Sequence, residues 1–300
     1  MIHDPALPEL AHLTDLEGAA EALDAFGFTP PVAVDVLSHR RGNRAVLRLS
    51  HSTGEVFCKL MQPEIAGQLA EHHRFLRQAG LPVPRVIGYT DGGALFLTTS
   101  EGTPGPDAVL HDDPEQVLDA IDDIRERFAN AGMTRPARES IATRIEWFLE
   151  QLMRALPDQR ARLEQLGYAV VPTKHAKPTE LHGIHGDLHI AQLFFADGAV
   201  SGVIDVDTAG LGEPDNDSAN CIAHAIASAI INDEAGNTEA GQALGLFADA
   251  ADRRWIRTTR ARALTAVHLL GHAQRAVAVE HWSRARKLIA LAERSTQSRS

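Results

Sequence analysis

The sequence has few lysines, few cysteines and no long apolar run. Only four of its 29 basic residues are lysine, and its two cysteines, Cys58 and Cys221, each lie in an apolar segment. We therefore expect two reduced cysteines in the core and no disulfide. No apolar run approaches the roughly 20 residues of a membrane-spanning helix, and the first ten residues lack the basic and apolar regions of a signal peptide. These absences predict a cytoplasmic protein with no membrane partner.

The net charge is -11, whereas nucleic acids attract positively charged proteins. An acidic chain of this kind is a poor partner for nucleic acid or for an anionic membrane surface. It is compatible with a cationic substrate, but a solvated acidic surface explains the charge equally well. The oligomeric state leaves no trace in the composition.

Hydrophobic periodicity divides the 300 residues into two parts. The first hundred residues alternate as short strands around one helix at about 64–78, which predicts a small antiparallel sheet with an inserted helix. The turn-rich segment 101–106 is the best boundary, and helical patterns dominate from Pro114 onward. We therefore predict an α+β fold with an N-terminal lobe at 1–100 and a mainly helical C-terminal lobe at 101–300.

One segment concentrates chemically useful side chains. Leu193–Phe195 and Val200–Ile204 are apolar runs joined by an Asp-Gly turn, the pattern of a β-hairpin. The outer ends of an antiparallel hairpin meet, so Gln192 is expected beside Asp205. Asp187 lies one short loop upstream of Gln192. The local sequence therefore predicts two carboxylates and an amide oxygen in one small volume.

These oxygen donors suit Mg²⁺, which binds one or two carboxylates together with substrate phosphates and water. Phosphoryl transfer needs such a metal and a carboxylate that accepts the proton of the acceptor hydroxyl. We interpret Asp187 as the catalytic base and Asp205 and Gln192 as metal ligands. His185 is expected to bond the loop backbone and support Asp187.

Two other interpretations compete for this segment. The aspartates could simply cap turns in a loop, an ordinary role for Asp beside Gly. A zinc site from His182, His185 and His189 is also conceivable, but Gly183 and Gly186 disfavour the helix that their spacing would need.

The segment IHGDLHIAQLFF followed by GVIDVDTAGLGEPDND closely resembles the catalytic loop and metal-binding segment of the aminoglycoside phosphotransferase and choline kinase-like superfamily. The resemblance covers most of the chain and implies a bilobal protein-kinase-like fold. The family usually has Asn where Gln192 stands, and maltokinase-like members are similar in carrying Gln. The longer side chain keeps the amide oxygen but could alter the metal spacing.

The resemblance also assigns roles in the N-terminal lobe. Lys59, in the apolar strand around Val56–Leu60, corresponds to the lysine that contacts the α- and β-phosphates of ATP. Its acidic partner on the next helix would be Glu71, with Glu64 as second choice. A lysine that protects an exposed sheet edge is the plainer interpretation of Lys59.

Further assignments rest on position alone. Gly42 and Asn43 stand where the family has its phosphate-covering loop, although an ordinary hairpin turn fits nearly as well. Thr98 and Ser100 fall at the adenine-binding hinge. Asp207 would support the metal site without binding the ion itself. The remaining acids lie at the start of the next helix. There, Asp217 would be the N-cap that bonds the catalytic loop, and Asp215 or Glu213 could bind substrate.

The function implied by the resemblance is phosphorylation of a small molecule. ATP and Mg²⁺ would be the cofactors, with GTP open as an alternative nucleotide. The partner would be a hydroxyl acceptor such as a sugar, amino sugar, aminoglycoside or amino alcohol. A nucleotide-binding pseudokinase without turnover is the rival, supported only by Gln192. A protein kinase fits less well, because the Asp-Phe-Gly and Ala-Pro-Glu motifs are missing.

Overall fold

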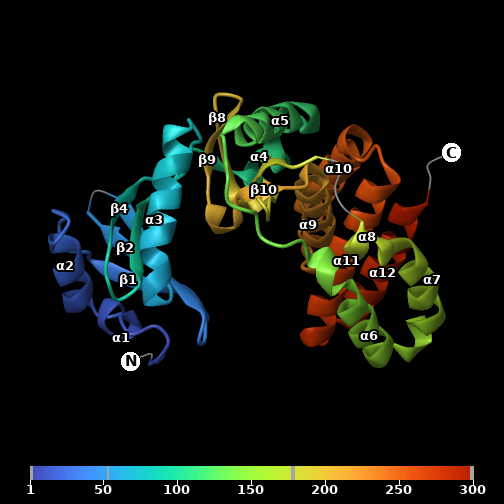
Figure 1. Ribbon diagram of the computed structural model, residues 1–300, viewed down its shortest axis with the longest axis horizontal. Helices are drawn as coiled ribbons and strands as arrows, with labels where there is room; N and C mark the ends of the chain where they lie inside the picture. Colours follow the sequence, from blue (N-terminus) through green and yellow to red (C-terminus); the bar gives the residue numbers. More distant parts are fainter. Residues whose placement is uncertain (1–2, 53, 177–179, 298–300) are drawn as a thin grey trace. The chain divides into compact units, whose positions relative to one another are not determined.

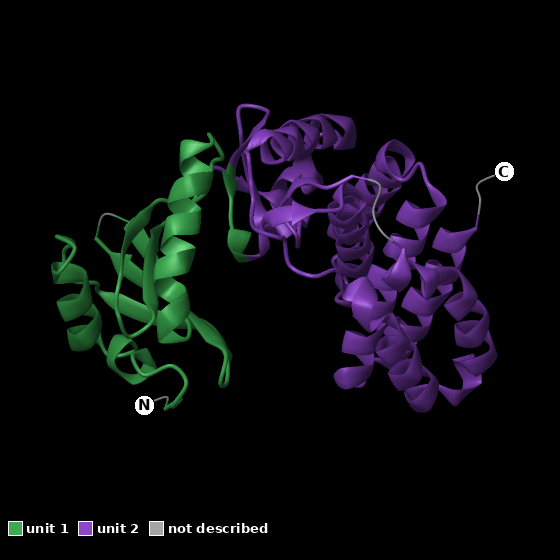
Figure 2. Cartoon of the chain, in the orientation of Figure 1, with its two compact units in different colours: residues 1–101, 202–207 green, residues 102–201, 208–300 purple. Residues whose placement is uncertain are grey.

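The computed structural model describes residues 3–52, 54–176 and 180–297. They form two compact units (Figures 1 and 2), the first of residues 1–101 with 202–207 and the second of residues 102–201 with 208–300. The N-terminal lobe predicted at 1–100 therefore also contains the segment that carries Asp205 and Asp207. Within the described residues, no helix has the length and apolar character needed to cross a membrane.

The first unit is built on a five-stranded sheet in which every pairing is antiparallel. The strand order is β1-β2-β3-β5-β4. The strands are β1 (Ala33–Arg40), β2 (Arg44–His51), β3 (Gly54–Leu60), β4 (Val86–Tyr89) and β5 (Ala94–Thr98). Three helices accompany them: α1 (Leu10–Leu13), α2 (Leu16–Asp24) and α3 (Pro63–Gln78).

The two faces of this sheet bury different residues. Leu47, Cys58 and Phe96 point to one face and form a core with the apolar residues of α1 and α2. The opposite face, with Leu95 and Leu97, packs on Ala66, Leu69 and Ala70 of α3. Because side chains alternate along a strand, Lys59 shares the α3-facing side of β3. The sheet register therefore sets the direction of this lysine.

The second unit is mainly helical, as predicted. Its long helices are α5 (Pro114–Asn130), α6 (Ile145–Ala155), α7 (Arg160–Val170), α9 (Pro214–Glu234), α10 (Thr238–Trp255), α11 (Thr259–Ala278) and α12 (Trp282–Thr296), and its short ones are α4 (Gly105–His111) and α8 (Pro172–His175). One apolar core joins α6, α7, α9, α11 and α12. Small residues such as Ala223 and Ala266, both fully buried, let α9 and α11 approach closely.

Short strands interrupt these helices. β7 (His182–Ile184) pairs with β10 (Gly210–Gly212), while β6 (Thr103–Pro104), β8 (Leu193–Ala196) and β9 (Ala199–Val203) form a three-stranded sheet. The turn between β8 and β9 places Asp197 and Gly198 at positive φ, 52° and 75°, as expected for a tight hairpin. The predicted hairpin is therefore confirmed, and β7 leads directly into the loop that carries Asp187.

Candidate active site

Lys59 forms the centre of a charged cluster in the first unit. Its Nζ donates to Asp207 Oδ1 at 2.7 Å and to Asp205 Oδ1 at 3.0 Å. Arg44 approaches the same oxygen of Asp205 at 3.7 Å. Burial alone would lower the pKa of the Lys59 ammonium, but the charges of Asp207 and Asp205 outweigh it and raise this pKa. The lysine is therefore a fixed cation between two carboxylates.

The alternative interpretation of Lys59 as an edge-strand residue is wrong. β3 lies between β2 and β5 in the sheet, so its backbone is paired on both sides. An interior strand needs no charged side chain to prevent edge pairing. A functional role therefore explains a charged side chain at this position better than edge protection does.

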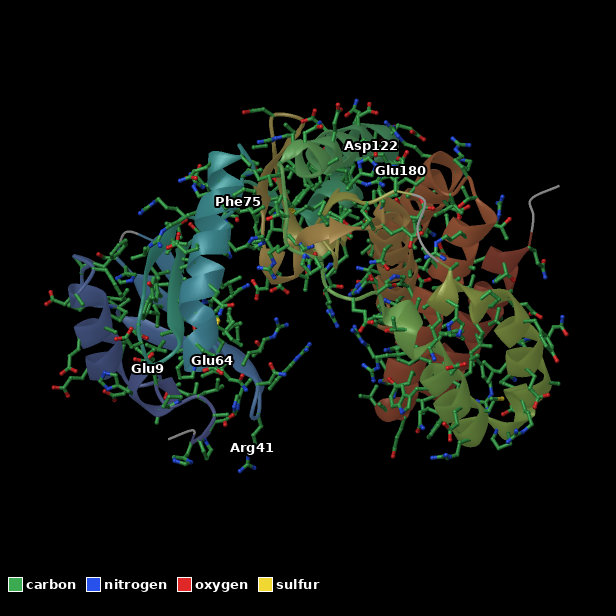
Figure 3. All side chains as sticks on the ribbon, in the orientation of Figure 1. Glu9, Arg41, Glu64, Phe75, Asp122 and Glu180 are labelled. Atoms are coloured by element: carbon green, nitrogen blue, oxygen red, sulfur yellow. The ribbon has the colours of Figure 1, made fainter. Side chains whose placement is uncertain are left out.

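The predicted pair between Lys59 and Glu71 does not form. Glu71 lies on the exposed side of α3, where it pairs with Arg74 at 2.5 Å, and Glu64 is exposed in the first turn (Figure 3). The buried face of α3 carries Ala66, Ala70 and His73 instead. At about 100° per residue, a helix that buries Ala70 turns its neighbour Glu71 away from the sheet.

His73 occupies the buried helix face that the resemblance had assigned to an acid. Its ring is completely buried, and Nδ1 lies 3.2 Å from the carbonyl oxygen of Pro84. Burial and the nearby charge of Lys59 lower the pKa of His73 to about 4. The ring is therefore neutral at physiological pH, and Lys59 faces a neutral neighbour from this helix. Sequence reasoning missed it, although its spacing from Ala66 and Ala70 marks an inward position.

In the turn predicted to cover phosphates, the backbone N–H groups of Gly42 and Asn43 already have acceptors within the protein. The N–H of Gly42, at φ 74°, donates to Asp4 Oδ2 at 2.7 Å, and that of Asn43 donates to Arg40 O at 2.9 Å. The bond from Gly42 is the main cause that lowers the pKa of the Asp4 carboxyl. This geometry favours the ordinary hairpin turn that the sequence left open.

The side-chain hydroxyls of the two predicted hinge residues, Thr98 and Ser100, differ in their hydrogen bonding. The Thr98 N–H donates to Arg85 O at 3.0 Å, and its Oγ1 accepts from the Arg85 N–H at 3.0 Å. The hydroxyl of Ser100 is buried and has no hydrogen-bond partner among the residues described. Of the two hydroxyls, that of Thr98 is used by Arg85 and that of Ser100 is buried without a partner in the described structure.

In the second unit, Asp217 anchors the loop that follows β7. Its carboxylate accepts the N–H groups of His185 at 2.7 Å and Gly186 at 2.9 Å. Burial raises the pKa of this carboxyl, while the two backbone bonds favour its charged form. The predicted bond to the loop is confirmed. The N-cap role is wrong, since α9 starts at Pro214 and Asp217 already lies in its first turn.

The loop backbone is held from the other side by Thr208, whose Oγ1 donates to His185 O at 2.9 Å. Gly186 has φ 82°, and a Cβ there would lie 2.5 Å from Thr208 O, so only glycine fits. The His185 ring is buried against Phe128, with centroids 5.8 Å apart. His185 thus supports the loop through its backbone bonds and ring packing.

Asp187 follows this anchored turn, and two residues position its carboxylate. Asn220 Nδ2 donates to Oδ1 at 3.2 Å and to Leu188 O at 3.0 Å, while Arg138 Nη1 lies 3.4 Å from Oδ2. Sequence reasoning missed both residues. Asn220 could have been found from helix geometry, because it lies three residues after Asp217 on the same face of α9.

The predicted metal ligands offer the oxygen donors that Mg²⁺ requires. Asp205, at φ 59°, presents a carboxylate that remains 32% exposed beside Lys59. The Gln192 side chain is buried, and its Oε1 accepts the His189 N–H at 3.2 Å, which leaves a second lone pair on that oxygen. Carboxylate and amide oxygens are hard donors of the kind that Mg²⁺ binds together with phosphates and water.

The alternative zinc site is wrong. Across the described residues, no group of three or more His, Cys, Asp or Glu side chains is arranged to hold a metal. The three histidines point to different surroundings. His182 is partly exposed beside Glu180, His185 packs on Phe128, and the His189 ring stacks on His224.

The two acids suggested for substrate binding have structural contacts. Glu213 forms a two-pronged ion pair with Arg260, with Nη2 to Oε2 at 2.7 Å. Asp215 accepts from the hydroxyl of Thr258 at 3.3 Å, and burial beside Glu213 raises the pKa of its carboxyl. Both residues connect the start of α9 to the start of α11.

The sequence profile described as "Phosphotransferase enzyme family" matches residues 34–257. A search of curated proteins finds no significant match. The bilobal α+β architecture is shared with solved aminoglycoside phosphotransferases, which confirms the predicted fold class.

Three solved structures illustrate the likeness of fold. A thermostable mutant of aminoglycoside phosphotransferase APH(4)-Ia with AMP-PNP and hygromycin B has a TM-score of 0.65 at 14% identity, covering 94% of this chain and 100% of that one. Another mutant, with ADP and hygromycin B, has a TM-score of 0.64 at 13% identity, covering 93% and 98%. The GDP complex of an aminoglycoside 2'-phosphotransferase-IIIa mutant has a TM-score of 0.56 at 12% identity, covering 93% and 96%.

Proposed function

Because the chain belongs to the phosphotransferase enzyme family, we propose that it is a small-molecule kinase that transfers the γ-phosphoryl group of ATP to an acceptor hydroxyl. One observation carries this proposal: Asp187, on a loop anchored by Asp217, presents its carboxylate in the wall of a cavity. A positioned carboxylate beside a cavity can accept a proton from a bound hydroxyl group.

Asp187 is the proposed base. Asn220 occupies one of its oxygens and Arg138 lies near the other, which fixes the plane of the carboxylate. Each carboxylate oxygen has a further lone pair for the acceptor hydroxyl.

Lys59, Asp205 and Gln192 are the proposed nucleotide and metal residues. When bound, ATP with Mg²⁺ would supply the phosphoryl group and offset its charge. Lys59 would then bind phosphate oxygens. Asp205 and Gln192 would bind the ion, and Asp207 would hold Lys59 in position. The hydroxyl of Ser100 is the proposed contact at the adenine hinge, and ATP is the proposed nucleotide, with GTP as the comparison in the assay. We place the reaction in the cytoplasm.

The experiment is an acceptor-dependent assay of ADP formation from ATP, with and without Mg²⁺, over sugars, sugar acids, amino sugars, aminoglycosides and amino alcohols. We expect at least one acceptor to be phosphorylated only in the presence of Mg²⁺. Asp187→Asn should lower turnover by about 10²–10⁴-fold, the usual contribution of a general base. Nucleotide binding without transfer to any acceptor would instead favour the pseudokinase.

A further inference from the structure

The cavity that contains Asp187 lies wholly within the second unit. Its wall combines the catalytic loop with residues 138–148, α9 and α11, and the space between them, including its open mouth, is about 740 Å³. Because Asp187 lies in this wall, a molecule bound here can bring a hydroxyl group to the proposed base.

The charged groups of this wall are mostly cationic. Arg138, Arg144 and Arg275 line the cavity, and its only acids are Asp187 and Glu139. Arg138 already forms an ion pair with Asp187. The wall therefore carries more positive than negative charge, in a chain whose net charge is -11.

Arg144 and Arg275 are the arginines of this wall that do not pair with Asp187. Neither has a carboxylate within ion-pair distance anywhere in the described part of the chain. By contrast, Arg254 contacts three acids on α5, one of which is Asp122 (Figure 3), and Arg260 is paired with Glu213. With acids in excess overall, two unpaired guanidinium groups at one cavity are not explained by a shortage of partners.

The position of Arg144 is fixed by aromatic rings. Its guanidinium lies 4.7 Å from the centroid of Trp147 and 5.5 Å from that of Phe148. Such stacking holds the planar group in one orientation while its N–H donors remain available at the edge. A guanidinium prepared in this way binds a carboxylate or phosphate through two parallel hydrogen bonds.

The histidines of the cavity add polarity without adding charge. The ring of His224 stacks on His189 and meets His272 edge-on, with centroids 4.2 Å and 4.4 Å apart. Burial, together with the charge of Arg275, lowers the pKa of His268 and of His272 to about 3. At neutral pH these rings are uncharged and can exchange hydrogen bonds with hydroxyl groups.

Asn216 adds a neutral polar group deep in the same wall. Its Oδ1 accepts from Ser140 Oγ at 2.7 Å and lies 3.2 Å from His268 Nε2. Its amide nitrogen has no partner among the residues that the structure describes and is a donor for the ligand. The cavity thus combines neutral hydrogen-bonding groups near Asp187 with two unpaired guanidinium groups.

We propose that the acceptor is a polyhydroxy compound that carries an anionic group, held by Arg144 and Arg275 while a hydroxyl group faces Asp187. A sugar acid has this chemistry, and so does a sugar phosphate. Aminoglycosides and amino alcohols carry ammonium groups, which these arginines would repel. The inference rests on the proposed kinase function and opposes the cationic acceptor that the net charge had allowed.

The test compares matched series of hexoses, their uronic acids, their 6-phosphates and their amino sugars. Binding is measured by calorimetry without nucleotide, and transfer by ADP formation with MgATP. We expect acidic compounds to bind and react in preference to neutral and amino sugars. The uronic acid and phosphate arms identify which anion the site takes.

The variants Arg144→Gln and Arg275→Gln should each weaken binding of the acidic ligand about tenfold or more, the loss of one charge-assisted contact. Binding of a neutral hexose should change less than twofold. Arg154→Gln, an exposed residue paired with Glu150 on α6, is the matched control and should change neither.

Tighter binding or faster phosphorylation of the amino sugar would overturn the inference and leave the kinase proposal intact. An acidic preference that survives both arginine substitutions would overturn it as well. Binding of acids that depends on both arginines, without any ADP formation, would support the inference and count against the kinase.

Discussion

The two charged regions of this protein have opposite balances. Around Lys59, one ammonium group lies between two carboxylates, so the positive charge is fully compensated. Around Asp187, three arginines line a cavity with two acids, and two of the arginines lack a carboxylate among the described residues. Lys59 is thus held by carboxylates of its own unit, whereas Arg144 and Arg275 line their cavity without such partners among the described residues.

This difference shows that net charge is a poor guide to the chemistry of a site. A chain with an excess of 11 negative charges still concentrates guanidinium groups at one cavity. Salt screens charges beyond about 8–10 Å, so a ligand in the cavity responds to the nearest arginines and little to distant acids.

The largest expected effect comes from breaking the compensated region. Lys59→Met should lower kcat/KM by about 10²–10³-fold, because it removes a preorganised cation from the phosphates and leaves Asp205 and Asp207 to repel each other. The measurement is steady-state ADP formation. Lys287→Met, which removes an exposed partner of Glu234, is the control and should stay within twofold. Equal activity of the two variants would contradict the role of Lys59.

A second test compares two acids of one helix turn. Asp217→Ala leaves the buried N–H groups of His185 and Gly186 without partners and should lower the free energy of unfolding by about 2–4 kcal/mol. Asp215→Ala removes only one contact, to Thr258, and should cost less than about 1 kcal/mol. Urea unfolding of both variants measures the difference. Similar losses would show that Asp217 is not the anchor of the loop.

Neutral buried histidines occur in both regions and predict a pH dependence. His73 has a pKa of about 4, and His268 and His272 of about 3, whereas an unfolded histidine titrates near 6.5. Below pH 6.5 the unfolded chain therefore binds more protons than the folded one. Stability should fall as the pH drops from 6.5 towards 4, by on the order of 3 kcal/mol for His73 alone.

Urea midpoints measured between pH 7 and 4 test this sign. His73→Gln can keep a bond to Pro84 O but removes the titrating group, so its stability should depend less on pH than that of the unchanged protein. An identical slope in both proteins would mean that His73 is not held neutral.

The smallest effect concerns the corrected partner of Lys59. Because Glu71 contacts Arg74 on the exposed face of α3, Glu71→Gln should change kcat/KM less than twofold and stability by less than about 0.5 kcal/mol. A loss of tenfold or more in kcat/KM would restore the predicted Lys59–Glu71 pair.

Local sequence patterns predicted the elements that depend on local forces. The helix expected at 64–78 is α3 (Pro63–Gln78), and the apolar strand expected around Val56–Leu60 lies in β3 (Gly54–Leu60). These features follow from hydrophobic periodicity and from the proline and glycine at the ends of the elements.

Features that depend on distant parts of the chain were not predicted. β7 needs β10 as a partner 30 residues away, since His182 pairs with Gly212. Asn220 and Arg138 reach Asp187 only once α9 and the segment before α6 are packed. Glu71 was assigned from the family resemblance alone, whereas the helix phase set by the buried Ala66 and Ala70 turns it away from the sheet.

The most direct test of the account separates the two regions by nucleotide affinity. Calorimetric titration with MgADP should give a dissociation constant for Asp187→Asn within about twofold of the unchanged protein, and one at least tenfold weaker for Asp205→Asn. That result would assign metal and nucleotide to the Lys59 region and leave Asp187 for the acceptor. Loss of MgADP affinity in Asp187→Asn, with Asp205→Asn unaffected, would contradict this division.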